Sequence, residues 1–335
     1  MKPISFTLIG MLFALSSVFS QELFPVHEPA SNIPKGVFGI RGVSESFKEI
    51  ALARNQFAAK IMYGITANWE VEAQTDFSNH HASTLPVNLV SHSHFGNRVY
   101  YFTNNKTYGI EYPYTFGGIY LYSKYRIFSM DRAEGHLRAA LFAEYSTTRV
   151  AHDEAEPDLQ GDTGGEGGGF VVTWLLHKMA VSLTTGFILP NDYKETRDDY
   201  RYNPPYFKTD LSYGRAAHFD LSFGYLLVPK QYDSYSNLNI NLYAEFEGKA
   251  YEAAKIIQND SVVNPISSAL LKGFYVDFFP GIQFIFNSNT RIDLSIGFSF
   301  YNHSYSHFNP IYSWGIQRYI FVNSHKAPKV LKQTF

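Results

Sequence analysis

Trp69-Glu-Val-Glu-Ala-Gln-Thr-Asp-Phe77 is the stretch of sequence that decides the fold. Its alternate positions form a largely apolar set and a polar set: Trp69, Val71, Ala73, Thr75 and Phe77 against Glu70, Glu72, Gln74 and Asp76. Successive side chains of a β-strand point to opposite faces, so the segment predicts a two-faced strand. The same alternation recurs along the chain. It predicts either a sheet that packs on a core or a transmembrane barrel whose apolar face meets lipid.

The N-terminus favours the membrane alternative. Residues 1–20 carry one basic residue, Lys2, then an apolar stretch and Val18-Phe19-Ser20, which predicts a signal peptide cleaved near Ser20. The sequence has no cysteine, which excludes a lipoprotein anchor, disulfides and thiolate chemistry. Beyond residue 20 no run of apolar residues is long enough for a spanning helix. We therefore expect an exported protein of the Gram-negative outer membrane, in contact with its lipid and lipopolysaccharide.

Composition narrows the function classes. The 28 basic and 30 acidic residues nearly balance and form no basic stripe, so no nucleic-acid partner is expected. The 25 Tyr and 29 Phe suit a large all-β core, and they equally suit the aromatic girdles of a membrane barrel.

The spacing of turns predicts an antiparallel up-and-down barrel. Twelve strands are predicted at about 36–47, 56–65, 69–79, 114–128, 136–148, 166–176, 180–190, 214–228, 238–251, 273–286, 291–301 and 312–322. Short connections alternate with mostly longer ones, as periplasmic turns and extracellular loops do in outer-membrane barrels. The predicted regions are a signal peptide (1–20), a proline-containing periplasmic segment (21–35), the barrel (36–322) and a polar tail (323–335). Ten or fourteen strands stay possible, chiefly because Arg98–Phe102 could belong to a further hairpin.

The alternation also predicts which charged residues face the lumen. A one-residue slip would place them in hydrocarbon. The expected inward acids are Glu45, Glu70, Glu72, Asp76, Glu144, Asp220, Glu245, Glu247, Asp277 and Asp293, and the expected inward bases are Arg41, Lys60, Lys124, Arg126, Arg138, Lys249 and Arg291. Twelve strands lie between the filled barrels of about eight strands and the water-filled porins of about sixteen. The charges therefore either line a weakly cation-favouring passage or satisfy one another in a filled interior. Whether residues 21–35 enter the lumen is left open.

Three local patterns resemble functional sites: a histidine-rich loop, a glycine run, and a His, Asp and Ser on one strand. His80, His81, His92 and His94 share one predicted outer loop and could bind zinc, copper or nickel, although their spacing matches no closed metal site. The run Thr163-Gly-Gly-Glu-Gly-Gly-Gly169 lacks the ending of a phosphate-binding loop, so its glycines predict a bend or close packing in the lumen. His218, Asp220 and Ser222 lie on one strand, where neighbours on a face are roughly 6–7 Å apart, too far for a catalytic triad. No enzyme activity and no cofactor are predicted.

One pair of segments carries a resemblance. Ile61-Met-Tyr-Gly-Ile-Thr-Ala-Asn-Trp-Glu-Val71, together with Ala30-Ser-Asn-Ile-Pro-Lys-Gly36, resembles the transporter-like barrels of the MetA-pathway of phenol degradation family. The resemblance implies uptake of small hydrophobic or aromatic compounds and supplies no binding residues. The leading hypothesis is thus a passive channel or transporter for a small solute. The alternatives are a non-transporting barrel whose loops bind a surface partner or metal, and a barrel enzyme acting on lipid. The oligomeric state is not predicted.

Overall fold

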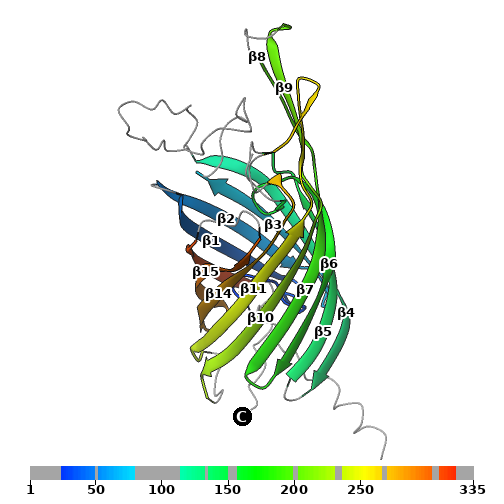
Figure 1. The fold of residues 1–335 in the computed structure, drawn as a ribbon. Helices are drawn as coiled ribbons and strands as arrows, with labels where there is room; N and C mark the ends of the chain where they lie inside the picture. The colour runs from blue at the N-terminus through cyan, green and yellow to red at the C-terminus, as the bar shows by residue number, and fades with distance from the viewer. Residues whose placement is uncertain are drawn as a thin grey trace, which may run out of the picture.

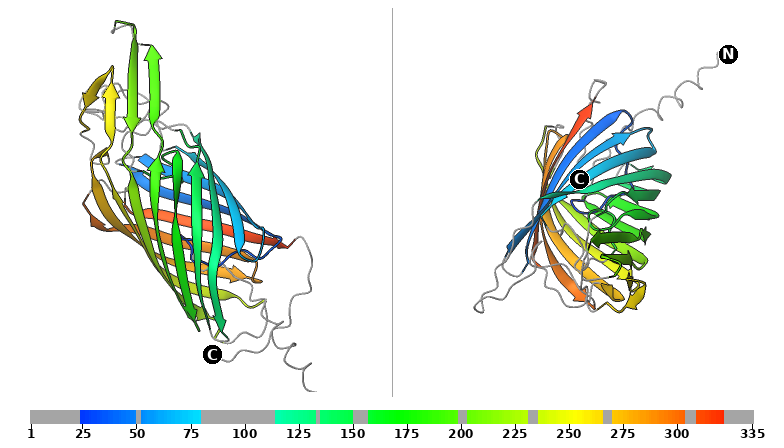
Figure 2. Two further views of the ribbon diagram at one scale, coloured as in Figure 1. Left: turned by 90° about the vertical axis from the view of Figure 1, so that its right-hand side faces the viewer. Right: turned by 90° about the horizontal axis from the view of Figure 1, so that it is seen from above.

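The protein is a closed antiparallel barrel of twelve strands, which confirms the predicted fold class. The computed structural model describes residues 24–49, 52–79, 114–132, 135–149, 157–198, 203–230, 236–265, 270–303 and 309–321. The barrel strands are β1 (Val37–Glu49), β2 (Leu52–Gly64), β3 (Trp69–Ser78), β4 (Thr115–Arg132), β5 (Gly135–Ser146), β6 (Gly165–Leu176), β7 (Met179–Pro190), β10 (Ala216–Val228), β11 (Asn239–Tyr251), β14 (Gly273–Phe286), β15 (Thr290–Asn302) and β16 (Ile311–Phe321). Closure comes from β1, which pairs with both β2 and β16 (Figure 1). Both views of Figure 2 show the orange-red β16 beside the blue β1.

The connections sort by length as the sequence predicts. One end of the barrel, here called the turn end, carries the short connections 65–68, 133–134, 177–178, 229–238 and 287–289. The opposite loop end carries the long connections, with one exception: β1 and β2 extend until only residues 50 and 51 separate them, where a connection over 48–55 was expected. The predicted signal peptide, residues 98–102 and the predicted tail 323–335 lie outside the described residues.

Two predicted loops contain strands that the sequence analysis missed. β8 (Tyr193–Asp198), β9 (Tyr206–Ser212), β12 (Lys255–Gln258) and β13 (Ser261–Val263) form a separate four-stranded sheet. The β8–β9 hairpin rises above the loop end of the barrel (Figure 1). Leu211, Ile256 and Leu270 form the buried core beside the four-stranded sheet. The strands are short and pair across two loops that are distant in sequence, so local alternation could not reveal them.

Burial in the barrel is inverted relative to that of a soluble sheet protein. Lys124 and Asp277 are 0% exposed, whereas Ile61 is 57% and Trp174 is 51% exposed. Along β3 the burial alternates residue by residue, with the charged set inside and the apolar set outside. Such an apolar exterior is what a bilayer solvates. Among the described residues, no helix is long and apolar enough to cross a membrane.

Two segments that are not barrel strands occupy the interior. Residues 24–34, here called the plug segment, run inside the barrel before β1, with Phe24, Ala30 and Ile33 buried. Residues 157–164, here called the inner loop, reach inward from the loop end, where Leu159 packs in one buried cluster with Tyr120 and Phe142. The expected periplasmic segment thus enters the lumen, a question that the sequence left open.

Candidate functional site

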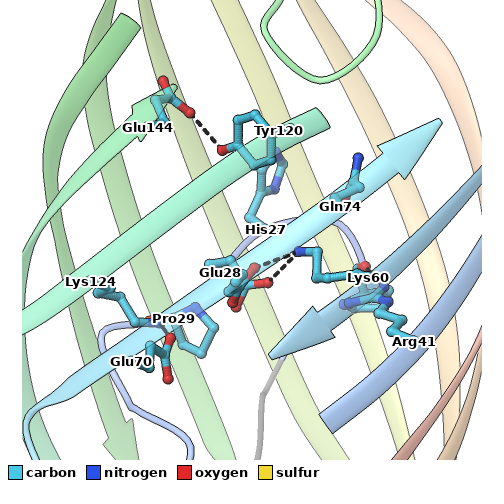
Figure 3. Close-up of polar contacts among 12 residues, drawn as sticks. His27, Glu28, Pro29, Arg41, Lys60, Glu70, Gln74, Tyr120, Lys124 and Glu144 are labelled. Carbon is cyan, nitrogen blue, oxygen red and sulfur yellow. Dashed lines mark hydrogen bonds and ion pairs between the residues drawn. The ribbon is translucent and has the colours of Figure 1, made fainter. Parts of the chain in front are cut away.

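The plug segment has no strand residues and does not pair with the barrel as a strand. Pro25, Pro29 and Pro34 have fixed φ and offer no N–H to a neighbouring strand. The segment contacts the barrel wall through side chains, carbonyl groups and the N–H groups of its other residues. Figure 3 shows His27, Glu28 and Pro29 among wall side chains contributed by several strands.

Lys124 and Glu70 form a buried ion pair that also holds the plug segment. The Lys124 Nζ lies 2.6 Å from Glu70 Oε1 and donates a 2.6 Å hydrogen bond to the Pro29 carbonyl (Figure 3). The Ile33 N–H donates to Glu70 Oε2 at 2.5 Å. Both wall side chains are almost fully buried, so the ion pair between them compensates for their loss of hydration.

Glu28 extends the interaction to β2. Lys60 Nζ lies 3.0 Å from Glu28 Oε1 and 2.9 Å from Glu72 Oε2. Burial alone would raise the pKa of Glu28, but the charges of Lys60, Lys124 and Arg41 outweigh it and lower that pKa to about 2.

The carboxylates of Glu28, Glu70 and Glu72 lie close enough together to suggest a metal site, with one oxygen of each within 4.8 Å of the others. The ammonium groups of Lys60 and Lys124 already neutralise two of the three charges from within hydrogen-bond distance. We therefore interpret the group as an ion-pair cluster.

His27 makes a second charged contact between the plug segment and the wall, on strands β10 and β11. Its Nδ1 lies 3.0 Å from Glu245 Oε2 on β11, and its Nε2 lies 3.3 Å from Asp220 Oδ1 on β10. Burial alone would lower the pKa of His27, but Asp220 and Glu245 outweigh it and raise that pKa to about 10. The imidazole is thus a buried cation between two carboxylates.

Ser222 completes a set that superficially resembles a catalytic triad. Its Oγ lies 3.4 Å from His27 Nδ1, but it donates its hydrogen bond to Glu245 Oε2 at 3.0 Å. A protonated imidazole cannot accept the serine proton, so this His27 is not a general base at neutral pH.

Other wall groups bind the backbone and the Ser31 side chain of the plug segment. The Ala30 N–H donates to Thr173 Oγ1 at 2.8 Å, Arg138 donates to Ser31 Oγ at 3.0 Å, and Arg41 donates to the Pro25 carbonyl. At the C-terminal end of the plug segment, a Cβ added to Gly64 would lie 2.3 Å from the Pro34 carbonyl oxygen. Only glycine allows this close approach.

The glycine run on β6 makes room for inward side chains, as the sequence analysis expected of it. A Cβ at Gly167 would lie 2.4 Å from Glu144 Oε1, and one at Gly169 would lie 2.8 Å from the Phe142 ring. Glu144 accepts a 2.7 Å hydrogen bond from Tyr120 (Figure 3). At the loop end Lys249 lies 3.4 Å from Asp158 of the inner loop.

The predicted lumen-lining residues lie as follows. Buried on the inner face are Glu70, Glu72, Asp76, Lys124, Arg138, Asp220, Glu245, Asp277 and Asp293. Glu144 and Glu247 are partly buried. Arg126 is displaced from this set, because it lies beside a register shift in β4 and donates to Ala67 and Asn68 in the turn 65–68. The loop histidines His80, His81, His92 and His94 lie outside the described residues.

The alternation pattern of the sequence did not indicate that His27, Glu28, Asp158 and Leu159 are interior residues. The available signal for the plug segment was its three prolines followed by a strand, together with more predicted inward acids than bases. Neither signal says which wall charges the segment meets.

No family model and no curated protein matches the chain. Among solved structures, the COG4313 outer membrane channel from Pseudomonas putida F1 is similar with a TM-score of 0.52 at 11% identity, over 89% of this chain and 100% of that one. The NanC porin has a TM-score of 0.42 at 9% identity, over 84% and 97% of the two chains. The Pseudomonas putida toluene transporter TodX has a TM-score of 0.32 at 10% identity, over 85% and 88%. The first likeness shows the fold of an outer-membrane barrel.

Proposed function

We propose that this protein is an outer-membrane channel for small solutes whose pore is closed by its own plug segment. The observation that carries the proposal is that charged wall side chains bind a segment that is not part of the barrel; they include Lys124 and Glu245, which are buried, and Lys60, which is partly buried. That segment continues directly into β1, so it is tethered beside the opening that it closes.

The plug segment is suited to reversible release. Lys124 keeps Glu70 and Lys60 keeps Glu72 as ion-pair partners on the wall itself, at 2.6 and 2.9 Å. Ser222 likewise keeps its hydrogen bond to Glu245. Water can replace the remaining polar contacts, and such exchanges have a small net free energy per bond. The wall therefore stays satisfied when the plug segment leaves.

The proposed solutes are small hydrophobic or aromatic compounds, as the resemblance to the phenol-degradation family implies. The rings of Tyr120, Tyr122, Phe142 and Tyr275 in the interior support this class, because aromatic walls favour flat apolar solutes. We also propose export by residues 1–20 with cleavage near Ser20, lipopolysaccharide around the loop end, a polar tail over 323–335, and no enzymatic role.

A non-transporting barrel that binds a surface partner is the second candidate. The feature that favours it is the four-stranded sheet, whose edge strands β8 and β13 have no further neighbour within the sheet. An edge strand can accept a strand from a partner. Conductance separates this candidate from the channel.

Conductance of the full chain should increase with pH. The pKa of His27 is raised from 6.5 to about 10 with the plug segment in place, so protonation stabilises the closed state fully below pH 6.5, and this stabilisation is lost as the pH rises toward 10. The groups that raise this pKa are Asp220 on β10 and Glu245 and Glu247 on β11, and His218 on β10 lies 3.7 Å from Asp220 on its other side. The ratio of closed to open channels should fall by up to about tenfold per pH unit in this window.

Single-channel recording in planar bilayers measures this ratio. The control is His27→Gln, which places a neutral amide between Asp220 and Glu245. The conductance of this variant should not depend on pH below about pH 9, because Tyr and Lys side chains begin to titrate only above that pH. Addition of aromatic and aliphatic solutes to the same bilayers tests the solute class by current block. A full chain that stays silent at every pH, and whose plug-deleted form is silent too, would overturn the channel proposal.

A further inference from the structure

The side chain of His27 binds a site on the barrel wall, here called the seat, that consists of Asp220 and Glu245. Asp220 is 6% and Glu245 is 1% exposed, and they lie on the adjacent strands β10 and β11. The two carboxylates contact opposite nitrogens of the same imidazole, at 3.3 and 3.0 Å. The ring is therefore hydrogen-bonded through Nδ1 to Glu245, while its Nε2 forms an ion pair with Asp220 without hydrogen-bond geometry.

The wall itself orients these acceptors. Ser222, 1% exposed, donates a 3.0 Å hydrogen bond to Glu245 Oε2. His218 Nδ1 lies 3.7 Å from Asp220 Oδ2, on the other carboxylate oxygen from the one that faces His27. All four side chains belong to the barrel, so the seat does not depend on the plug segment for its construction.

We propose that this seat is a binding site for small organic cations of the imidazolium class, and that His27 is its tethered occupant. The inference rests on the proposed function, because a free cation reaches the seat only when the plug segment leaves or lacks its imidazole. Two carboxylates on opposite sides of a flat ring fit a small cation that donates a charge-assisted hydrogen bond to Glu245 and places positive charge beside Asp220. A tether gives His27 an effective concentration in about the millimolar range, so weakly binding free cations compete poorly in the unaltered chain.

The experiment therefore removes the tethered occupant and keeps the rest of the chain. His27→Gly in the full-length protein leaves the seat vacant, and imidazole is added at pH 6, where it is protonated. The matched probe is 1,3-dimethylimidazolium, which has the same ring and charge and no N–H donor. Binding is measured by calorimetry on the detergent-solubilised protein, independently of conductance. We expect imidazole to bind at least about tenfold more tightly than its dimethyl analogue, because the analogue cannot donate the charge-assisted hydrogen bond to Glu245 and its methyl groups keep the ring away from both carboxylates.

Two further variants locate the binding. His27→Gly combined with Asp220→Asn, or with Glu245→Gln, should lose most of the imidazole affinity, and the unaltered protein should bind imidazole more weakly than His27→Gly does. In bilayers, imidazole should lengthen the closed times of His27→Gly. Equal binding of both probes, or binding that survives the Asp220 and Glu245 substitutions, would overturn the inference. A silent His27→Gly channel that still binds imidazole selectively would contradict the proposed function and leave the binding site standing.

Discussion

Deletion of residues 24–33 is expected to convert a mostly closed channel into a continuously open one. In the structure these residues occupy the space between the β2–β4 wall, where Lys60 and Lys124 lie, and the β10–β11 wall, where Glu245 lies. A minor state of a two-state protein is typically populated at about 0.1–10%, so complete opening should raise the time-averaged current by about ten- to a thousandfold. The measurement is single-channel recording of the deletion variant beside the full chain.

The barrel should survive this deletion. Its closure depends on pairing of β1 with β2 and β16, and none of these ladders includes residues 24–33. Unchanged far-ultraviolet circular dichroism and heat-modifiable migration in gels provide the control. A folded deletion variant that conducts no better than the full chain would mean that other parts of the protein close the lumen.

Substitution of Lys124 by Met should destabilise the protein by about 3–5 kcal/mol, since it leaves Glu70 buried without its ion-pair partner. Lys124 is 0% and Glu70 1% exposed, and 2.6 Å separates Nζ from Oε1. The same substitution removes the donor to the Pro29 carbonyl, so the plug segment should also loosen. Urea unfolding in detergent, followed by tryptophan fluorescence, measures the loss.

A double variant separates charge burial from packing. Glu70→Gln with Lys124→Met removes both charges and keeps an acceptor for the Ile33 N–H, so it should recover most of the lost stability. Lys208→Met is the exposed control: Lys208 is 45% exposed in its ion pair with Asp210, and its loss should cost less than about 1 kcal/mol. Equal losses for Lys124→Met and Lys208→Met would show that the interior is as well hydrated as the surface.

Much of the barrel could be predicted from sequence because lipid on one side and water or polar groups on the other impose a period of two. The segment Trp69–Phe77 has the predicted facing throughout, and β14 has the predicted bounds, 273–286. The predicted inward acids Asp277 and Asp293 are buried for the same reason.

The plug segment and the outer sheet could not be predicted in this way. His27 meets Asp220 and Glu245, which lie about two hundred positions later, so no local pattern encodes the contact. β9 pairs with β12 across some forty positions. Arg126 shows a different limit. The alternation along β4 predicts that its side chain points inward, but a register shift after Arg126 lets the guanidinium bind the turn 65–68.

The central claim is that the plug segment closes the pore and can leave it, and a reversible cross-link tests this most directly. Ala30 on the plug segment and Ala140 on β5 are both 0% exposed and belong to one buried cluster. The sequence has no cysteine, so Ala30→Cys with Ala140→Cys introduces the only two thiols. With the cross-link verified by mass spectrometry, as a disulfide or a short bis-thiol bridge, current should be abolished at every pH. Reduction of the disulfide should restore the openings, and each single-cysteine variant should be indifferent to reductant. A cross-linked protein that conducts as well as its reduced form would contradict the account.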